Sequence, residues 1–372
     1  MYSVYQHWDP LKVCIVGKSY APQFYSFIKN SRVRNVMERI AYETEEDYQK
    51  LIKLLESFNV KILRPDVQND YTLCLLADGK ISLPPMTPRD YTAMMGDIFY
   101  RPYSIKEYYN YCKGTDWPEV MPQSPAELDN LPDFVKKELQ QFKIYDSVHS
   151  VGWNNVWENI PNTTIKQTGI NTATTTRIGK DLYFGTETYS ANIPELEKKY
   201  SSMFPNYRCH IINTGGHSDG TFCPVVPGLI VSLLDVPTYK DTFPDWEVVY
   251  LPRQSWSRVG PFLSLKLKNK GKWWVPGEEL NDDFTHFVES WLNHWVGYVE
   301  ETVFDVNMLV IDEKNVVCNN YNEKVFEAFD RYGITPHVIN FRHRYFWDGG
   351  LHCITSDIHR EGTMKDYFPE RG

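Results

Sequence analysis

Short apolar runs alternate with longer amphipathic segments along most of this 372-residue chain. Apolar runs of about four to eight residues are typical of buried strands, and apolar residues spaced three and four apart are typical of helices. The alternation predicts an α/β or α+β protein, because each element must bury its apolar face against a neighbour. Strands are predicted at 12–16, 60–63, 182–185, 210–212, 229–234, 248–251, 262–267, 308–311, 316–318 and 337–339, and helices at 32–58, 104–111, 193–204, 282–295 and 323–332.

The predicted helix over 32–58 shows the pattern best. Thr44 with Asp47 three residues later resembles a capping box, which marks a helix start. The apolar positions after it recur on one face and predict core packing. They are Tyr48, Leu51, Ile52, Leu55 and Phe58. The helix over 282–295 has a similar face, with Trp291 among its inward residues.

The composition argues against several classes of protein. The formal charge of −9 disfavours nucleic acid as a partner, because phosphate binding needs a basic face, whereas a small cation remains suitable. No apolar run reaches membrane-spanning length, and the first residues lack the features of a secretory signal. Seven scattered cysteines without CxxC spacing fit neither a zinc site nor a redox pair, and indicate free thiols in a reducing cytosol. We expect one cytoplasmic domain over 1–372.

One cysteine has an unusual setting near the end of the chain. Cys353 follows the double glycine Gly349–Gly350, within the run WDGGLHCITSD. Glycines allow close backbone packing and leave a thiol reachable from a cavity. A buried, inert cysteine is the simpler alternative, because reactivity needs surroundings that favour the thiolate.

A second stretch, GGHSDGT, places His217 and Asp219 two residues apart beside glycines. If the local chain is extended, both side chains point to one face. A lone histidine is more often structural than catalytic, but a His-x-Asp pair together with a glycine-flanked cysteine favours a site. A third stretch is rich in proline and ends in Pro88–Arg89–Asp90, where Asp90 by itself reads as a surface-turn carboxylate. The composition of the proline-rich segment 113–135 indicates a long surface loop, which is either a lid over an entrance or a plain connection.

Several motifs in register resemble the glycine/inosamine-phosphate amidinotransferase family of the pentein, or guanidino-group modifying, superfamily. The resemblance covers most of the chain. It rests on HWDPLKVCIVG at 7–17, PRD at 88–90, GDI at 96–98, RIGKD at 177–181, the His217 stretch, NMLVIDEK at 307–314 and the Cys353 segment.

The resemblance implies a five-bladed α/β propeller (pentein) of ββαβ modules. It implies that Cys353 is the nucleophile and His217 the acid/base. Asp90 and Asp219 would hold the planar guanidinium, with Arg89 as a further substrate-binding residue. The donor would be arginine or a related guanidine and the acceptor a small amine. No metal ion or organic cofactor is implied. Proteins of this family often pair as homodimers, but the sequence leaves the oligomeric state open.

Three positions depart from the family pattern. Asn171 stands where the family has an aspartate that supports the catalytic histidine; Glu158 and Glu187 are candidate substitutes or ordinary surface acids. Val236 replaces an arginine that binds a substrate carboxylate. Glu300 and Glu301, where small hydroxyl residues are usual, are either a solvated segment end or substrate-binding residues that favour an ammonium group over a carboxylate.

Three functions therefore remain open from the sequence. The first is an amidinotransferase acting through Cys353. The second is a hydrolase or deiminase of the same superfamily, in which water resolves the cysteine adduct. The third is a guanidine-binding or catalytically impaired homologue, to which Asn171 points.

Overall fold

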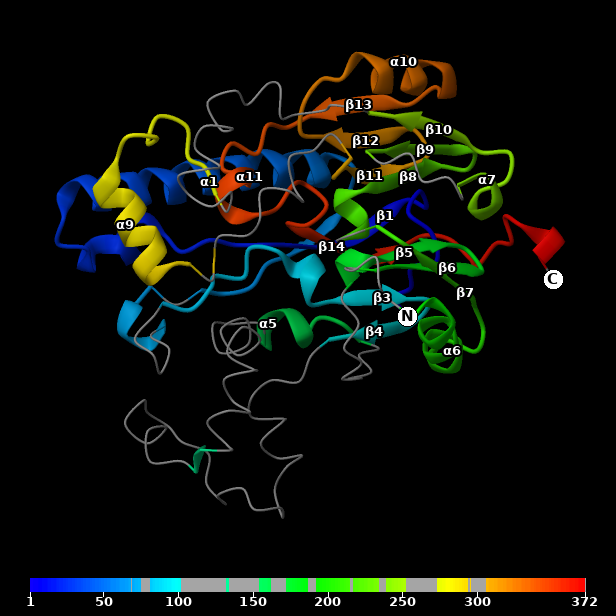
Figure 1. Cartoon of the computed structure of the whole chain (residues 1–372), viewed down its shortest axis with the longest axis horizontal. Coiled ribbons are helices and arrows are strands. Elements are labelled where there is room, and N and C mark those ends of the chain that lie inside the picture. The colour runs from blue at the N-terminus through cyan, green and yellow to red at the C-terminus, as the bar shows by residue number, and fades with distance from the viewer. Residues whose placement is uncertain are drawn as a thin grey trace.

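The computed structural model has five small sheets among its described residues (Figure 1). The described residues are 1–67, 69–74, 81–101, 132–133, 154–161, 172–186, 192–214, 217–233, 239–251, 273–293, 295 and 306–371. The sheets have the strand orders β14-β1-β2, β3-β4, β5-β6-β7, β10-β9-β8 and β11-β12-β13. The strands are β1 (Leu11–Val16), β2 (Lys61–Leu63), β3 (Ala93–Met95), β4 (Ile98–Tyr100), β5 (Thr175–Ile178), β6 (Asp181–Gly185), β7 (Arg208–Ile212), β8 (Phe222–Val226), β9 (Leu229–Ser232), β10 (Glu247–Tyr250), β11 (Leu309–Asp312), β12 (Asn315–Cys318), β13 (Thr335–Val338) and β14 (Thr355–Arg360).

Four of these sheets share one connectivity. In each, two antiparallel strands are followed by a helix and by a third strand that pairs parallel with the second. Three of them follow chain order, and the fourth joins the last strand, β14, to β1 and β2 from the first part of the chain. The five sheets, four of which are ββαβ modules among the described residues, confirm the propeller expected from the sequence. The α-helices are α1 (Ser31–Ser57), α5 (Asn154–Trp157), α6 (Ile193–Met203), α7 (Tyr239–Thr242), α9 (Asp282–Trp291), α10 (Glu323–Tyr332) and α11 (Arg344–Trp347).

Burial falls from the first strand of a module to the third. Every residue of β5 and β8 is buried, whereas β10 and β13 have no buried residue. The first strands therefore lie towards the middle of the molecule and the third strands towards its surface. In the view of Figure 1, α10 lies above the strands and α6 below them, and α1 runs from the left edge of the molecule towards the strands.

Helix α1 starts well before the predicted capping box. Its N-cap is Asn30, whose side chain accepts hydrogen bonds from the backbone N–H groups of Arg32 and Val33. Thr44 and Asp47 are buried in the middle of the helix, so the capping-box prediction is wrong. Thr44 instead accepts a hydrogen bond from Trp347 Nε1 at 2.8 Å.

Most of the other predicted elements in the described part of the chain are confirmed within a few residues. The hairpin turn between β11 and β12 lies at the predicted polar residues, where Asp312 Oδ1 accepts from the N–H of Lys314 at 2.8 Å. Gly333 ends α10 with a left-handed φ of 68°. Trp291, expected inward, is 44% exposed on α9. The predicted helix 104–111 and strand 262–267 lie outside the described residues, as does the loop 113–135 apart from 132–133.

Candidate active site

The site residues come from the loops that lead into the first strand of each module. Short 3-10 helices precede three of these strands: η3 (Pro88–Asp90) before β3, η4 (Thr172–Thr174) before β5 and η5 (Ser218–Gly220) before β8. Asn307 precedes β11, and Cys353 precedes β14. Segment η3 contacts η4 and β14, and η4 contacts η5. Because the first strands lie innermost, their entrance loops meet in the middle of the molecule.

Cys353 is the centre of this cluster and is 3% exposed. Its Sγ donates to Asp219 Oδ2 at 3.3 Å and accepts from Asn307 Nδ2 at 2.9 Å. The double glycine before it is required sterically. A Cβ on Gly350 would lie 2.6 Å from Asn307 Oδ1, and one on Gly349 would lie 2.9 Å from a methyl carbon of Thr87.

The Cys353 thiol is held in its neutral form. Burial raises its pKa well above 9.0, and the nearby charges of Asp219 and Asp90 raise it further. The hydrogen bond from Asn307 acts in the opposite direction and lowers the pKa. Both carboxylates predicted to hold a cation therefore act electrostatically on this sulfur, although they come from different modules.

His217 and Asp219 lie at the start of η5, and the local chain is not extended as supposed. Backbone bonds from Gly220 N to His217 O and from Thr221 N to Ser218 O close a tight turn. Asp219 is nevertheless ionised: burial raises its pKa, but His352 and His217 together bring it below 3.8. The charge of His217 therefore acts on the carboxylate that contacts Cys353.

His352 is a site residue that the sequence analysis did not single out. Its Nδ1 lies 2.8 Å from Asp219 Oδ2, the same oxygen that Cys353 contacts. Burial and then the charge of Arg89 lower the pKa of His352, so the ring is neutral. An ionised carboxylate only accepts hydrogen bonds, so the proton is assigned to Nδ1. Its position directly before Cys353 was the signal available in the sequence.

Known proteins resemble this chain over nearly its whole length. Over 400 aligned residues it is 24% identical to mitochondrial glycine amidinotransferase of Xenopus tropicalis, covering 98% of this chain and 84% of that protein. It is 22% identical to the L-arginine:L-lysine amidinotransferase of Pseudomonas savastanoi pv. phaseolicola, covering 98% and 96%. No protein-family model matches.

Two solved structures share the fold. SxtG, an amidinotransferase of Microseira wollei from the saxitoxin biosynthetic pathway, superposes with a TM-score of 0.57 at 17% identity. The inosamine-phosphate amidinotransferase StrB1 of Streptomyces griseus gives 0.56, also at 17% identity. Each comparison covers 99% of both chains. The chain is a homologue of the amidinotransferases. Its fold is the pentein α/β propeller.

In this amidinotransferase homologue, the side chain of Arg89 forms hydrogen bonds with other residues of the protein. Its Nη1 donates to Asp357 Oδ1 at 2.7 Å and its Nε to the Thr355 carbonyl at 3.0 Å. Its backbone N–H donates to the Cys353 carbonyl at 3.3 Å. These contacts brace the segment that carries the cysteine, a role different from the substrate contact expected for Arg89.

Asp357 joins three buried guanidinium groups behind the cysteine. Besides Arg89, it accepts from Arg177 Nη2 at 2.7 and 2.8 Å and from Arg360 Nε at 2.6 Å. All four side chains are at most 4% exposed. Burial raises the pKa of Asp357, but the three positive charges hold it well below 3.8. His7 lies beside them and accepts from the Arg177 N–H at 3.2 Å.

Several predicted residues lie outside the described part of the chain. They are Asn171, Glu187, Val236, Glu300 and Glu301. Asn171 directly precedes η4, which contacts both η3 and η5. Glu158, one candidate substitute for the missing aspartate, is exposed just after α5.

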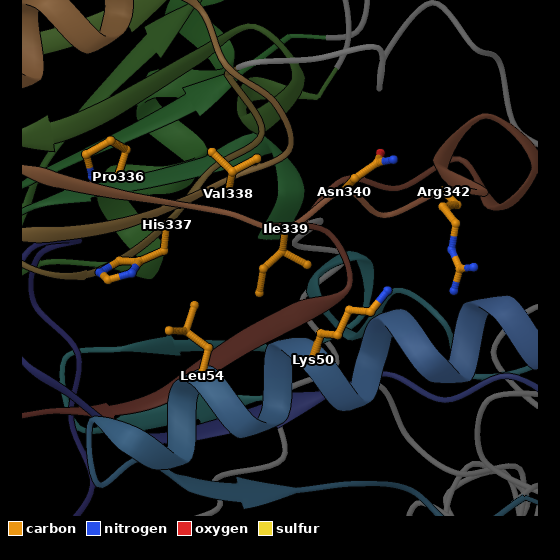
Figure 2. A pocket seen from close by; sticks show the side chains of 8 residues that line it. All are labelled: Lys50, Leu54, Pro336, His337, Val338, Ile339, Asn340 and Arg342. Atoms are coloured by element: carbon orange, nitrogen blue, oxygen red, sulfur yellow. The ribbon is translucent and has the colours of Figure 1, made fainter.

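A pocket of about 710 Å³ lies elsewhere, between α1 and the 336–342 segment (Figure 2). None of the predicted site residues lines it. Its cations are already paired: Arg342 binds Asp47 and Glu46, and Lys50 binds Asp47.

Within the described residues, no group of three acidic, histidine or cysteine side chains could hold a metal ion, and no helix is long and apolar enough to cross a membrane.

Proposed function

We propose that this protein moves an amidino group from arginine, or a related guanidine, to an amine acceptor through a covalent adduct on Cys353. The observation that supports this most directly is the convergence of a buried thiol and two carboxylates. Cys353 Sγ lies 3.3 Å from Asp219, and the charges of both Asp219 and Asp90 act on it. Buried carboxylates beside a thiol disfavour its ionisation, so the thiolate forms readily only when a cation lies between the carboxylates. A guanidinium is a cation whose planar fork suits carboxylates.

The bound cation would also activate the nucleophile. Without it, burial and then the charges of Asp219 and Asp90 raise the pKa of the Cys353 thiol and keep it neutral. A guanidinium held between the carboxylates cancels these charges and favours the thiolate. The nucleophile would therefore form next to the carbon that it attacks.

The reaction would proceed in two halves. Cys353 Sγ passes its proton to His217 and bonds to the guanidinium carbon, and the carbon–nitrogen bond to the donor's amine breaks as His217 passes that proton on to the leaving nitrogen. The acceptor amine then bonds to the same carbon, loses its proton to His217, and releases the thiolate. The protein's own groups suffice for each proton and electron pair. Because these groups come from several modules, we propose that 1–372 works as one domain.

Substrate preference and the turnover rate would depend on residues outside the described part of the chain. Asn171 could orient the imidazole of His217 but could not stabilise its positive charge, and a comparable Asp-to-Asn change in a serine protease triad slows turnover about 10⁴-fold. Glu300 and Glu301 would favour substrates with an ammonium group, since carboxylates repel carboxylates. We therefore propose that the protein prefers agmatine-like donors or polyamine-like acceptors, which carry an ammonium group, to arginine and glycine, which carry a carboxylate. If Asn171 leaves turnover too slow to matter, the remaining candidate is a guanidine-binding protein.

Intact-mass measurement with labelled arginine, and separately with labelled agmatine, tests the proposal. We expect the mass of one amidino group on Cys353, followed by its transfer to added amines. The Cys353→Ser variant should form no adduct, and Cys14→Ser, which alters another buried cysteine, should behave as the wild type. Release of the adduct by water alone would indicate a hydrolase. Absence of any adduct would refute the proposal and favour a binding protein. Better use of carboxylate-bearing substrates would refute the assigned preference.

A further inference from the structure

Asn307 lies in the fourth entrance loop, the one before β11. Its side chain is fully buried. The amide contacts the Cys353 segment at three atoms: Oδ1 accepts from the N–H of His352 at 2.8 Å and of Cys353 at 3.1 Å, and Nδ2 lies 2.9 Å from Sγ. The same Nδ2 donates to the Asp219 carbonyl at 3.2 Å.

The orientation of this amide follows from its partners. Two backbone N–H groups can only donate, so the atom that they contact must be the oxygen. The NH₂ group therefore faces the Asp219 carbonyl, which only accepts, and the sulfur. Both donors of the NH₂ group are used, and one of them points at Sγ.

We propose that Asn307 is a further catalytic residue, which stabilises the Cys353 thiolate by donating a hydrogen bond to Sγ. A donor bonds more strongly to an anion than to a neutral group, so this contact favours the thiolate over the thiol. The assignment rests on the proposed role of Cys353 as nucleophile. The thiolate is then formed twice in each cycle, before it attacks the donor and when the acceptor displaces it, and Asn307 would favour both steps.

The arrangement also explains why Gly350 is a glycine. A Cβ there would lie 2.6 Å from Asn307 Oδ1 and 2.8 Å from its Cβ, so a larger residue would displace the amide. Because Nδ2 also binds the Asp219 backbone, the amide keeps the nucleophile and the carboxylate clamp at a fixed separation.

The test is the pH dependence of alkylation of Cys353 by iodoacetamide, followed by peptide mass spectrometry without any guanidine. Two variants are compared with the wild type. Asn307→Ala removes the donor, and Asn307→Asp keeps the shape and the oxygen that holds the backbone but turns a second oxygen towards Sγ. At about pH 8 we expect alkylation to slow roughly 10- to 100-fold in Asn307→Ala and more in Asn307→Asp, with the whole profile displaced to higher pH.

Asn319→Ala is the matched control. Asn319 is also buried and donates to the Asn307 carbonyl at 3.1 Å, and no described contact links it to the sulfur. A structural role of Asn307 would lower the melting temperature without displacing the alkylation profile, and an unchanged profile in folded Asn307→Asp would overturn the proposal. Alkylation requires no substrate. The result therefore stands apart from the adduct experiment: a displaced profile without adduct formation would show that Asn307 stabilises the thiolate but would reject amidino transfer and, with it, the catalytic role of Asn307.

Discussion

The Asp357→Asn change removes one buried negative charge from among three buried guanidinium groups. The carboxylate accepts at 2.6–2.8 Å from Arg89, Arg177 and Arg360, and its own side chain is fully buried. Asparagine has nearly the same shape but is neutral, and its NH₂ group would face guanidinium donors. Removing one partner of a buried ion pair costs about 3–5 kcal/mol, because the other charge is left unpaired in a low dielectric.

That cost is a large part of the roughly 5–15 kcal/mol by which folded domains are stable. At about 2.1 cal/mol/K per residue, the unfolding entropy of 372 residues is about 0.8 kcal/mol/K. Dividing the cost by this entropy gives a fall in melting temperature of about 4 to 6 °C. Thermal unfolding followed by circular dichroism measures it. Asp366→Asn is the matched control, because Asp366 also binds an arginine but is 26% exposed, so water screens the pair and little change is expected.

The change also has a pH signature. The pKa of Asp357 lies well below 3.8 in the folded protein, so its ionised form stabilises the fold above about pH 4. In the wild type this contribution is lost as pH falls from there towards the folded pKa, and Asp357→Asn should lack that part of the acid sensitivity. A variant that melts within about 1 °C of the wild type would refute the reasoning, since three unpaired buried cations could not be so well tolerated.

Two further predictions concern the site and the C-terminal segment. Asp90→Asn removes a charge that raises the pKa of Cys353, so alkylation of that thiol without substrate should speed up while adduct formation from a guanidine slows; slower alkylation would contradict the electrostatic role of Asp90. Arg371→Ala removes hydrogen bonds to Asp181 at 3.2 Å and to the Tyr183 hydroxyl at 2.8 Å, and urea unfolding should show a loss of about 1–3 kcal/mol. An unchanged urea midpoint would mean that the C-terminal segment does not stabilise the module of β5 to β7.

The sequence was a good guide wherever a local pattern decides the outcome. Periodicity located α1, α10 and the β11–β12 hairpin, because backbone hydrogen bonding and the burial of one face act over a few residues. It failed at Thr44 and Asp47, whose spacing imitates a helix start. Their real partners, Trp347 and Arg342, lie about 300 residues away and appear only when the chain is folded.

The candidate site likewise contains residues that the sequence indicated and residues that only the structure revealed. The resemblance to amidinotransferases singled out Cys353 and Asp219 before any geometry, and the fold places them in contact. The roles of Asn307 and Asp357 could not be predicted from the sequence, because the sequence does not show whether a given asparagine or aspartate is buried. The sequence by itself determined the local helices and strands and, through the family resemblance, named the candidate reactive groups. Only the tertiary structure decided which polar side chains are buried against the sulfur, because burial and charge pairing depend on contacts between modules distant along the chain.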